Sequence, residues 1–244
     1  MTRSFFPDIQ RLVVTCEHGS NRVPLVYRRI FGRHTRLLHS HHGYDLGALE
    51  LARRIAERLR CPLYYSTVTR LLVDLNRSVG NRSVFSSISR ELPAEERRRL
   101  LRRYYDPYRN AVQSAVRGMM NEPGATLHLA VHTFTPILGG TARTADIGIL
   151  YDPARPNERT LAQAWKQILC QMRRDFQVRR NYPYLGKADG CTTYLRKRHP
   201  THQYLGIELE VNQRFVSSPR GVWRSVQSLI VESLETLLLQ PRAR

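Results

Sequence analysis

Carboxylate and imidazole side chains follow two short apolar runs of this chain, and they are of the types that bind catalytic metals. Glu17 and His18 come directly after the run 12–15, and His132 follows the run 127–131. A catalytic zinc site takes about three protein ligands from histidine and carboxylate and leaves one position for water. Each residue alone is as well explained by a capped loop or a hydrogen-bonded histidine. Together, Glu17, His18 and His132 could supply the zinc ligands.

Two glutamates interrupt a third apolar run with the spacing of a β-strand. Glu208 and Glu210 lie two residues apart in the segment 205–212, so both side chains point to the same face of the strand. Two like charges on so apolar a strand are costly unless a cation compensates them. One of the two is therefore a candidate general base that activates a metal-bound water. A structural pair of carboxylates at the rim of the sheet remains the alternative.

A fourth polar cluster surrounds the apolar run 71–73. Arg70, Asn76 and Arg77 can together hold a carboxylate, because a guanidinium fork gives it two parallel hydrogen bonds. An ion pair of Asp74 with Arg70 or Arg77 is the structural alternative. The cluster therefore predicts either an anion contact or an internal ion pair.

Further polar groups stand outside these clusters. Arg143 follows a turn at Gly139 and Gly140 and is another candidate anion contact. His41 and Asp45 precede the first long helical pattern and offer additional metal-binding groups. The simpler interpretation is that Asp45 caps that helix and His41 only holds the loop.

The elements that must position these residues are short apolar runs that alternate with helical patterns. Strand-like runs occur at 12–15, 62–65, 71–73, 127–131, 147–150 and 205–209. Helical patterns cover 46–59, 93–120, 161–172 and 222–239. The alternation predicts an α/β fold, a three-layer sandwich with helices on both faces of a mixed, largely parallel sheet. In such sheets, sites form at the carboxyl ends of strands, where the polar clusters stand.

The composition indicates one compact unit. A chain of 244 residues, 41% of them hydrophobic, can bury one substantial core, which predicts a single domain over residues 1–244. No apolar stretch is long enough to span a membrane, and the first residues lack the apolar core of a signal peptide, so we expect a cytoplasmic protein. The four cysteines lie far apart and are expected to be free thiols.

The net charge of +19 introduces a second class of function, nucleic-acid binding. Of the 39 basic residues 36 are arginine, a bias that genome base composition can produce without a ligand. The densest run, 97–103, follows Glu95 and Glu96 in a helical pattern, as on a solvated helix face. The polar residues at strand ends favour an enzyme over an arginine-rich nucleic-acid-binding protein, whose binding would fall steeply with salt. In an enzyme, the positive charge would attract an anionic substrate.

Six motifs follow one another in the chain: Cys16–Pro24, His41–Ala48, Arg70–Ser78, His132–Pro136 with Arg143, Asn181–Tyr184 and Glu210–Asn212. In their order and residue types they resemble the N-formylglutamate amidohydrolase family, over roughly residues 12–216. The resemblance implies a fold similar to that of the zinc carboxypeptidases and aspartoacylases. It also implies one zinc per chain and hydrolysis of the amide bond of a small N-acyl amino acid such as N-formylglutamate.

The resemblance assigns two of the metal ligands directly but not the third. His18 and His132 match the metal-binding histidines of the relatives. Asn21 stands where those relatives have a glutamate, so in our interpretation Glu17 is the third ligand. Asn21 is then assigned to the substrate, and Asn21 itself or a residue of the loop 41–45 is the alternative third ligand.

The remaining roles concern substrate and catalysis. Asn76 and Arg77 match the pair that holds the substrate carboxylate in the carboxypeptidases, with Arg143 as a further contact. Glu210 resembles their catalytic glutamate, and Arg70 is assigned to the oxyanion that forms on attack. The predicted partner is a small anionic N-acyl amino acid. A family member that binds a ligand without turnover is the remaining rival, which a turnover assay separates from the enzyme.

Overall fold

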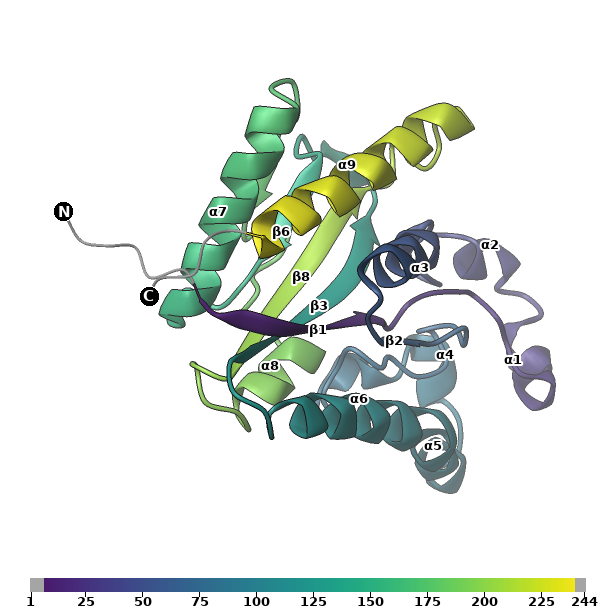
Figure 1. The fold of residues 1–244 in the computed structure, drawn as a ribbon. Coiled ribbons are helices and arrows are strands. Elements are labelled where there is room, and N and C mark those ends of the chain that lie inside the picture. The colour runs from purple at the N-terminus through teal and green to yellow at the C-terminus, as the bar shows by residue number, and fades with distance from the viewer. Residues whose placement is uncertain (1–6, 240–244) are drawn as a thin grey trace.

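The computed structural model describes residues 7–239, in which six strands form a central sheet in the order β2-β1-β3-β8-β6-β7 (Figure 1). A separate hairpin is formed by β4 and β5. The strands are β1 (Ile9–Cys16), β2 (Leu63–Tyr65), β3 (Ala125–Phe134), β4 (Ile137–Leu138), β5 (Thr141–Ala142), β6 (Ile147–Leu150), β7 (Val178–Arg180) and β8 (Tyr204–Asn212).

The sheet is mixed and largely parallel. β2, β1, β3 and β8 run in one direction, whereas β6 is antiparallel to β8 and β7 is parallel to β6. The carboxyl ends of β1, β3 and β8 therefore meet at one edge, and His132 of β3 lies directly beside Glu210 of β8 in the register. The predicted fold class is confirmed.

Helices cover both faces of the sheet. α3 (Ala48–Leu59), α7 (Pro156–Met172) and α9 (Arg220–Leu238) pack on one face, while α6 (Asp106–Met119) and α8 (Cys191–Arg196) pack on the other (Figure 1). The remaining helical segments are η1 (Leu25–Tyr27), α1 (Arg28–Phe31), α2 (Thr35–Leu38), η2 (Arg82–Val84), α4 (Ser87–Arg90), α5 (Ala94–Leu100) and η3 (Leu101–Tyr105). No helix within residues 7–239 is long and apolar enough to cross a membrane.

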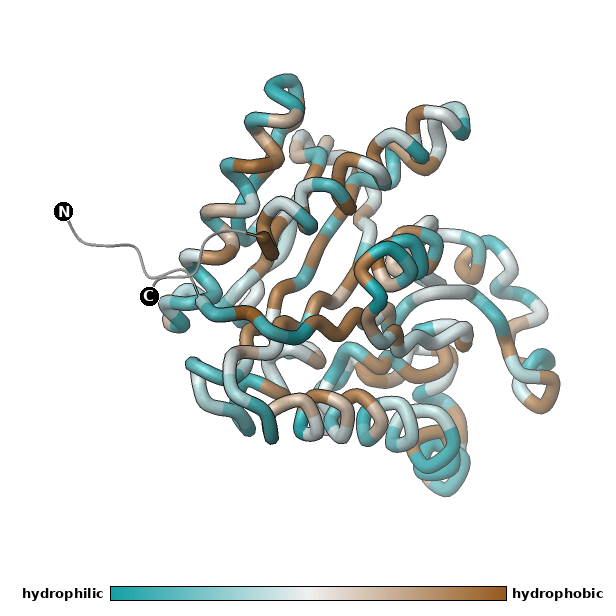
Figure 2. Tube along the Cα trace, viewed as in Figure 1, coloured by the Kyte–Doolittle hydropathy of each residue, from teal (hydrophilic) through white to brown (hydrophobic). Residues whose placement is uncertain are grey.

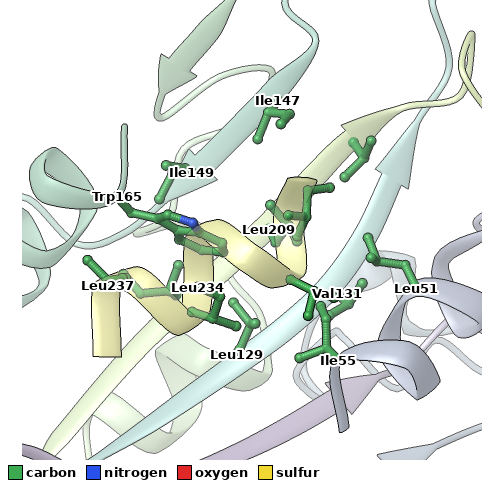
Figure 3. Packing of buried hydrophobic residues seen from close by; sticks show 14 of the residues in the cluster. Leu51, Ile55, Leu129, Val131, Ile147, Ile149, Trp165, Leu209, Leu234 and Leu237 are labelled. Carbon is green, nitrogen blue, oxygen red and sulfur yellow. The ribbon is translucent and has the colours of Figure 1, made fainter. Parts of the chain in front are cut away.

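The largest core lies between the sheet and the face formed by α3, α7 and α9. Hydrophobic residues concentrate in the strands and on the inward sides of the helices, and hydrophilic residues on the outer turns (Figure 2). Leu51 and Ile55 of α3 and Leu234 of α9 belong to one buried cluster with Leu129 and Val131 of β3 (Figure 3). The indole of Trp165, buried in the same cluster, donates a hydrogen bond of 2.9 Å to the Ser233 hydroxyl. This packing makes the sheet a rigid support for the residues at its edge.

The predicted strand at 71–73 is wrong. These residues form turns, and their buried side chains pack in two small clusters beside the main core. A short apolar run is equally consistent with any buried segment, so the apolar pattern alone cannot identify a strand. The other five predicted strands are present, whereas the three-residue β7, with two exposed arginines, was not predicted.

The helical pattern 93–120 is a continuous helical segment made of α5, η3 and α6, in which η3 is a π-helical turn. On its exposed side, Arg98 and Arg102 pair with Glu95, and Arg99 pairs with Glu96. These arginines therefore belong to the ion-paired, solvated face that the sequence indicates. The four cysteines are unpaired, as expected.

Candidate active site

A polar cavity of about 170 Å³ lies at the edge where the parallel strands end. The segments that supply its walls are far apart in the sequence, which is typical of a site at the carboxyl ends of strands. Its lining residues are His18, His41, Asp45, Arg70, Asn76, Arg77, His132, Thr133, Phe134, Thr135, Tyr184, Leu185, Ala188, Asp189, Glu208 and Glu210.

Two buried imidazoles converge on one carboxylate oxygen. The Nδ1 atom of His132 lies 2.8 Å from Oδ2 of Asp45, and the Nδ1 atom of His18 lies 3.3 Å from the same oxygen. One potential ligand atom from each of His18, Asp45 and His132 lies within 4.8 Å of the other two, and the three residues are buried. One ion could therefore be held by all three.

The outer nitrogen of each imidazole faces a second carboxylate. Nε2 of His18 is 2.8 Å from Oδ1 of Asp74, and Nε2 of His132 is 3.3 Å from Oε2 of Glu17. Glu17 is itself held by the Tyr108 hydroxyl, which donates to Oε1 at 2.9 Å. Histidines that ligate metals usually donate their outer N–H to such a carboxylate, which fixes the orientation of the ring.

The site is rich in negative charge. The carboxyl groups of Glu17, Asp45, Asp74 and Glu210 are buried, and Arg70 is the one arginine among the described residues that pairs with any of them. Burial opposes ionisation of Glu17, yet the neighbouring His132 brings its pKa down to about 2. Burial likewise opposes a charge on His132, but Asp45 and Glu17 hold its pKa well above the ordinary value. The same field would stabilise a bound cation.

Glu208 and Glu210 differ in their partners. Glu208 accepts a hydrogen bond from the Thr192 hydroxyl. Oε2 of Glu210 is buried without a hydrogen-bond partner among the described residues. Burial raises the pKa of Glu210 to about 8. Both line the cavity, as the period-two spacing predicts, but Glu210 has the free oxygen.

The cluster at 70–77 resolves the predicted alternatives. Arg70 donates to Asp74 through Nε at 3.2 Å and Nη2 at 2.8 Å, so the Asp74–Arg70 ion pair forms. Arg77 lines the cavity and has no carboxylate within ion-pair distance in residues 7–239. Asn76 lies beside His132, with 3.5 Å between Nδ2 and Nε2. Arg77 therefore offers a guanidinium without a direct ion pair next to the histidine and carboxylate cluster, although Asp74 and Asp189 lie near enough to interact with its charge.

Two assigned substrate residues lie farther out. Arg143 does not line the cavity, but it stacks on Phe134 and donates to the Tyr184 hydroxyl at 3.2 Å, and both of these residues do line it. Asn21 is not among the lining residues, and its amide instead contacts Nδ1 of His39 at 3.2 Å. The structure thus brings Arg143 to the rim and leaves Asn21 outside.

The predicted helix cap at Asp45 is wrong. α3 is preceded by Gly47 with φ +82°, and no side chain caps it. A Cβ at Gly47 would lie 2.8 Å from Val216, so the close approach requires glycine there. Asp45 is freed for the cavity, and its backbone N–H donates to the His18 carbonyl at 2.9 Å.

Supporting residues at the end of η3, on α6 and on the segment before α8 were also missed. Tyr105 donates from its hydroxyl to the Arg77 carbonyl at 2.8 Å, and buried Arg109 donates to the Leu75 carbonyl at 3.0 Å. Tyr108 and Asp189 hold Glu17 and Arg77, respectively. The sequence carries one signal of this, the i, i+3, i+4 spacing of 105, 108 and 109 on one helix face.

This fold and cavity define a mixed α/β protein with a buried histidine and carboxylate site at its strand ends. A family model described as N-formylglutamate amidohydrolase matches residues 10–217, and the chain belongs to that family. The chain is thus an amide hydrolase by family, and the predicted resemblance is confirmed.

Two solved structures share the fold. A gene product of Agrobacterium tumefaciens is 26% identical, with a TM-score of 0.79 over 96% of this chain and 91% of that one. The N-formylglutamate amidohydrolase from Ralstonia eutropha JMP134 is 19% identical, with a TM-score of 0.71 over 95% of each chain. The comparison with curated proteins gave no significant match.

Proposed function

We propose that this chain hydrolyses the amide bond of a small N-acyl amino acid, such as N-formylglutamate, with one zinc ion per chain. One observation carries the proposal: both buried imidazoles direct Nδ1 at the same Asp45 oxygen and Nε2 at a separate carboxylate. This is the pattern of ligands with their outer partners. Membership of the amidohydrolase family supports the reaction class.

The donor set fits zinc. Nδ1 of His18, Nδ1 of His132 and Oδ2 of Asp45 would be the three protein ligands, which leaves a fourth tetrahedral position. Glu17, the ligand expected from the sequence, instead becomes the carboxylate that orients His132. When bound, the ion supplies a Lewis acid that polarises the amide carbonyl and lowers the pKa of a water molecule.

Glu210 is the proposed general base. Its free Oε2 atom would take a proton from the attacking water and later pass it to the departing nitrogen. A nearby cation lowers the pKa of a carboxyl group, so occupancy of the site would favour the ionised form of Glu210. The carbonyl carbon gains the water oxygen, the C–N bond breaks, and a carboxylate and an amine result.

Asn76 and Arg77 would hold the substrate carboxylate, because Arg77 has no ion-pair partner among the described residues and faces the cavity. Arg143 would approach the outer part of an anionic substrate from the rim. Arg70 directs its donors at Asp74 and Asp45, so its proposed contribution is to hold these carboxylates.

The test combines metal analysis with a substrate screen. Elemental analysis of the purified protein should give about one zinc per chain, and N-formyl and N-acetyl amino acids should be screened for release of the free amine. Removal of the metal by a chelator should abolish turnover, and added zinc should restore it. A zinc-loaded protein that turns over none of these compounds would be a non-catalytic binder, and the proposal would fail.

A further inference from the structure

The segment 185–191 forms one wall of the cavity and contacts both residues proposed to hold the substrate carboxylate. Nη1 of Arg77 donates to the backbone carbonyl of Asp189 at 2.5 Å. The Oδ1 atom of Asn76 accepts from the backbone N–H of Cys191 at 2.7 Å. The positions of both side chains therefore depend on where this segment runs.

One carboxylate ties that segment to the loop that carries Arg77. Asp189 accepts from the backbone N–H of Ser78 at 2.9 Å and from Nδ2 of Asn81 at 2.7 Å. Its other oxygen accepts from the Ser78 hydroxyl. The two segments, more than a hundred residues apart in the chain, are thus joined by the Asp189 side chain in addition to the Arg77 and Asn76 contacts.

The helix α8 also holds the wall, since Arg196 and Thr193 donate to the carbonyls of Gly186 and Ala188. On its cavity side the packing is sparse. Leu185 and Ala188 line the cavity yet are exposed to solvent, so they bury little apolar surface. At Gly190, an added Cβ would lie 3.1 Å from Oδ1 of Asn76, which is tighter than ordinary contact. The backbone must pass very close to Asn76, and Asp189 is the anchor next to that point.

We propose that Asp189 is a positioning residue for substrate recognition: its carboxylate fixes the 185–191 wall, and its backbone carbonyl orients the guanidinium of Arg77 toward the substrate carboxylate. With Nη1 held at one fixed point, the remaining N–H groups present a single geometry, so little side-chain entropy is lost on binding. The inference rests on the proposed function, whose substrate carries a carboxylate.

The electrostatic effect and the positioning effect of Asp189 on substrate binding have opposite signs, so an experiment can distinguish them. A negative Asp189 near Arg77 weakens the attraction for an anionic substrate, so removal of the charge alone would strengthen binding. Positioning predicts weaker binding when the anchor is removed. Asp189→Asn separates the two effects, because the amide keeps an acceptor for Ser78 and Asn81 and lets the Ser78 hydroxyl become an acceptor.

The experiment measures kcat and KM for N-formylglutamate and its two monoamides. Asp189→Ala should raise KM for N-formylglutamate at least tenfold with kcat within threefold, and should leave KM nearly unchanged for the monoamide that lacks the recognised carboxylate. Asp189→Asn should stay within threefold of the parent. Asp175→Ala is the control, since Asp175 is an exposed aspartate that, within residues 7–239, pairs only with Arg173 and does not line the cavity. It should behave as the parent does.

The outcomes are distinct. An unchanged or lower KM in Asp189→Ala, or a fall in kcat that is equal for all three compounds, overturns the positioning role. If Asp189→Ala does not fold, Ser78→Ala removes only one contact to the carboxylate and should raise KM about threefold; no rise overturns the proposal.

An inactive parent enzyme would instead refute the proposed function. In that case the Arg77 side-chain NMR signal, assigned by its loss in Arg77→Lys, reports on positioning directly. The signal should shift in Asp189→Ala and remain in Asp189→Asn, and an unmoved signal overturns the inference.

Discussion

A buried imidazole beneath the cavity predicts how stability depends on pH. His128 of β3 is fully buried between the Thr15 hydroxyl at 2.8 Å and the Tyr204 hydroxyl at 2.7 Å. Burial lowers its pKa from 6.5 to about 4. As the pH falls, His128 is therefore protonated near pH 6.5 in the unfolded chain but only near pH 4 in the folded protein. Stability from this group is complete above pH 6.5 and is lost as the pH falls.

The size of the effect follows from the shift. When the pH falls from 7.5 to 4.5, this difference in the pKa of His128 lowers the free energy of unfolding by about 2.5 kcal/mol. His128→Gln is neutral over this range and can still bond both hydroxyls. The free energy of unfolding of the parent should thus fall by about 2.5 kcal/mol more than that of the variant.

Urea unfolding of the metal-free proteins, followed by circular dichroism at several pH values, measures this difference. Groups such as Glu17 that titrate in both proteins cancel in the comparison. A difference between parent and variant that stays constant within about 0.5 kcal/mol from pH 7.5 to 4.5 would falsify the reasoning, because His128 would then be protonated in the folded state.

Three further predictions concern the site. His132→Ala should lose most of its zinc, measured by elemental analysis, while its circular dichroism spectrum stays that of the parent, since the cavity lies at the edge of the sheet. Glu210→Gln should retain zinc while turnover falls by about a hundredfold or more, the size of a general-base contribution. Arg77→Lys keeps the charge, but a lysine cannot both hold the Asp189 carbonyl and bind a carboxylate through two hydrogen bonds. The transition-state stabilisation calculated from kcat/KM should therefore fall by about 1.5–3 kcal/mol.

Each prediction has an outcome that contradicts it. Full zinc content in His132→Ala removes that residue from the ligand set. A larger effect of Glu208→Gln than of Glu210→Gln means that the base is the other glutamate. If Arg77→Lys impairs a carboxamide analogue as much as the carboxylate substrate, Arg77 does not recognise the carboxylate.

The edge of the sheet and its polar side chains could be predicted because their signal is local. A polar residue that follows an apolar run locates His18 and His132 at or near the carboxyl end of a strand, and the period-two spacing within an apolar run locates Glu210. Neither signal needs long-range information. Asp45 follows no strand, and a local interpretation as a helix cap explains it equally well. The sequence names Asp45 only as one of several alternatives, and the chain reversal that brings its N–H to the His18 carbonyl places it in the cavity.

The helix α6 illustrates the opposite limit. Its polar and aromatic residues look like a partly solvated helix face, yet Tyr108 reaches Glu17 and Arg109 reaches the carbonyl of Leu75. Such contacts join residues 34 or more positions apart, and no local pattern encodes them. Hydrophobic periodicity locates the helix but cannot tell which polar groups it will meet.

The π-helical turn η3 sets the angular phase between α5 and α6. A π turn accommodates one more residue than an α-helical turn, and each residue of an α-helix advances by about 100° around the axis. Because the wider turn absorbs the extra residue, α5 and α6 keep nearly the phase that one regular α-helix would give them. Leu100 therefore stays in its apolar cluster while Tyr108 reaches Glu17. The widened turn thus helps to keep the outer carboxylate of His132 in place.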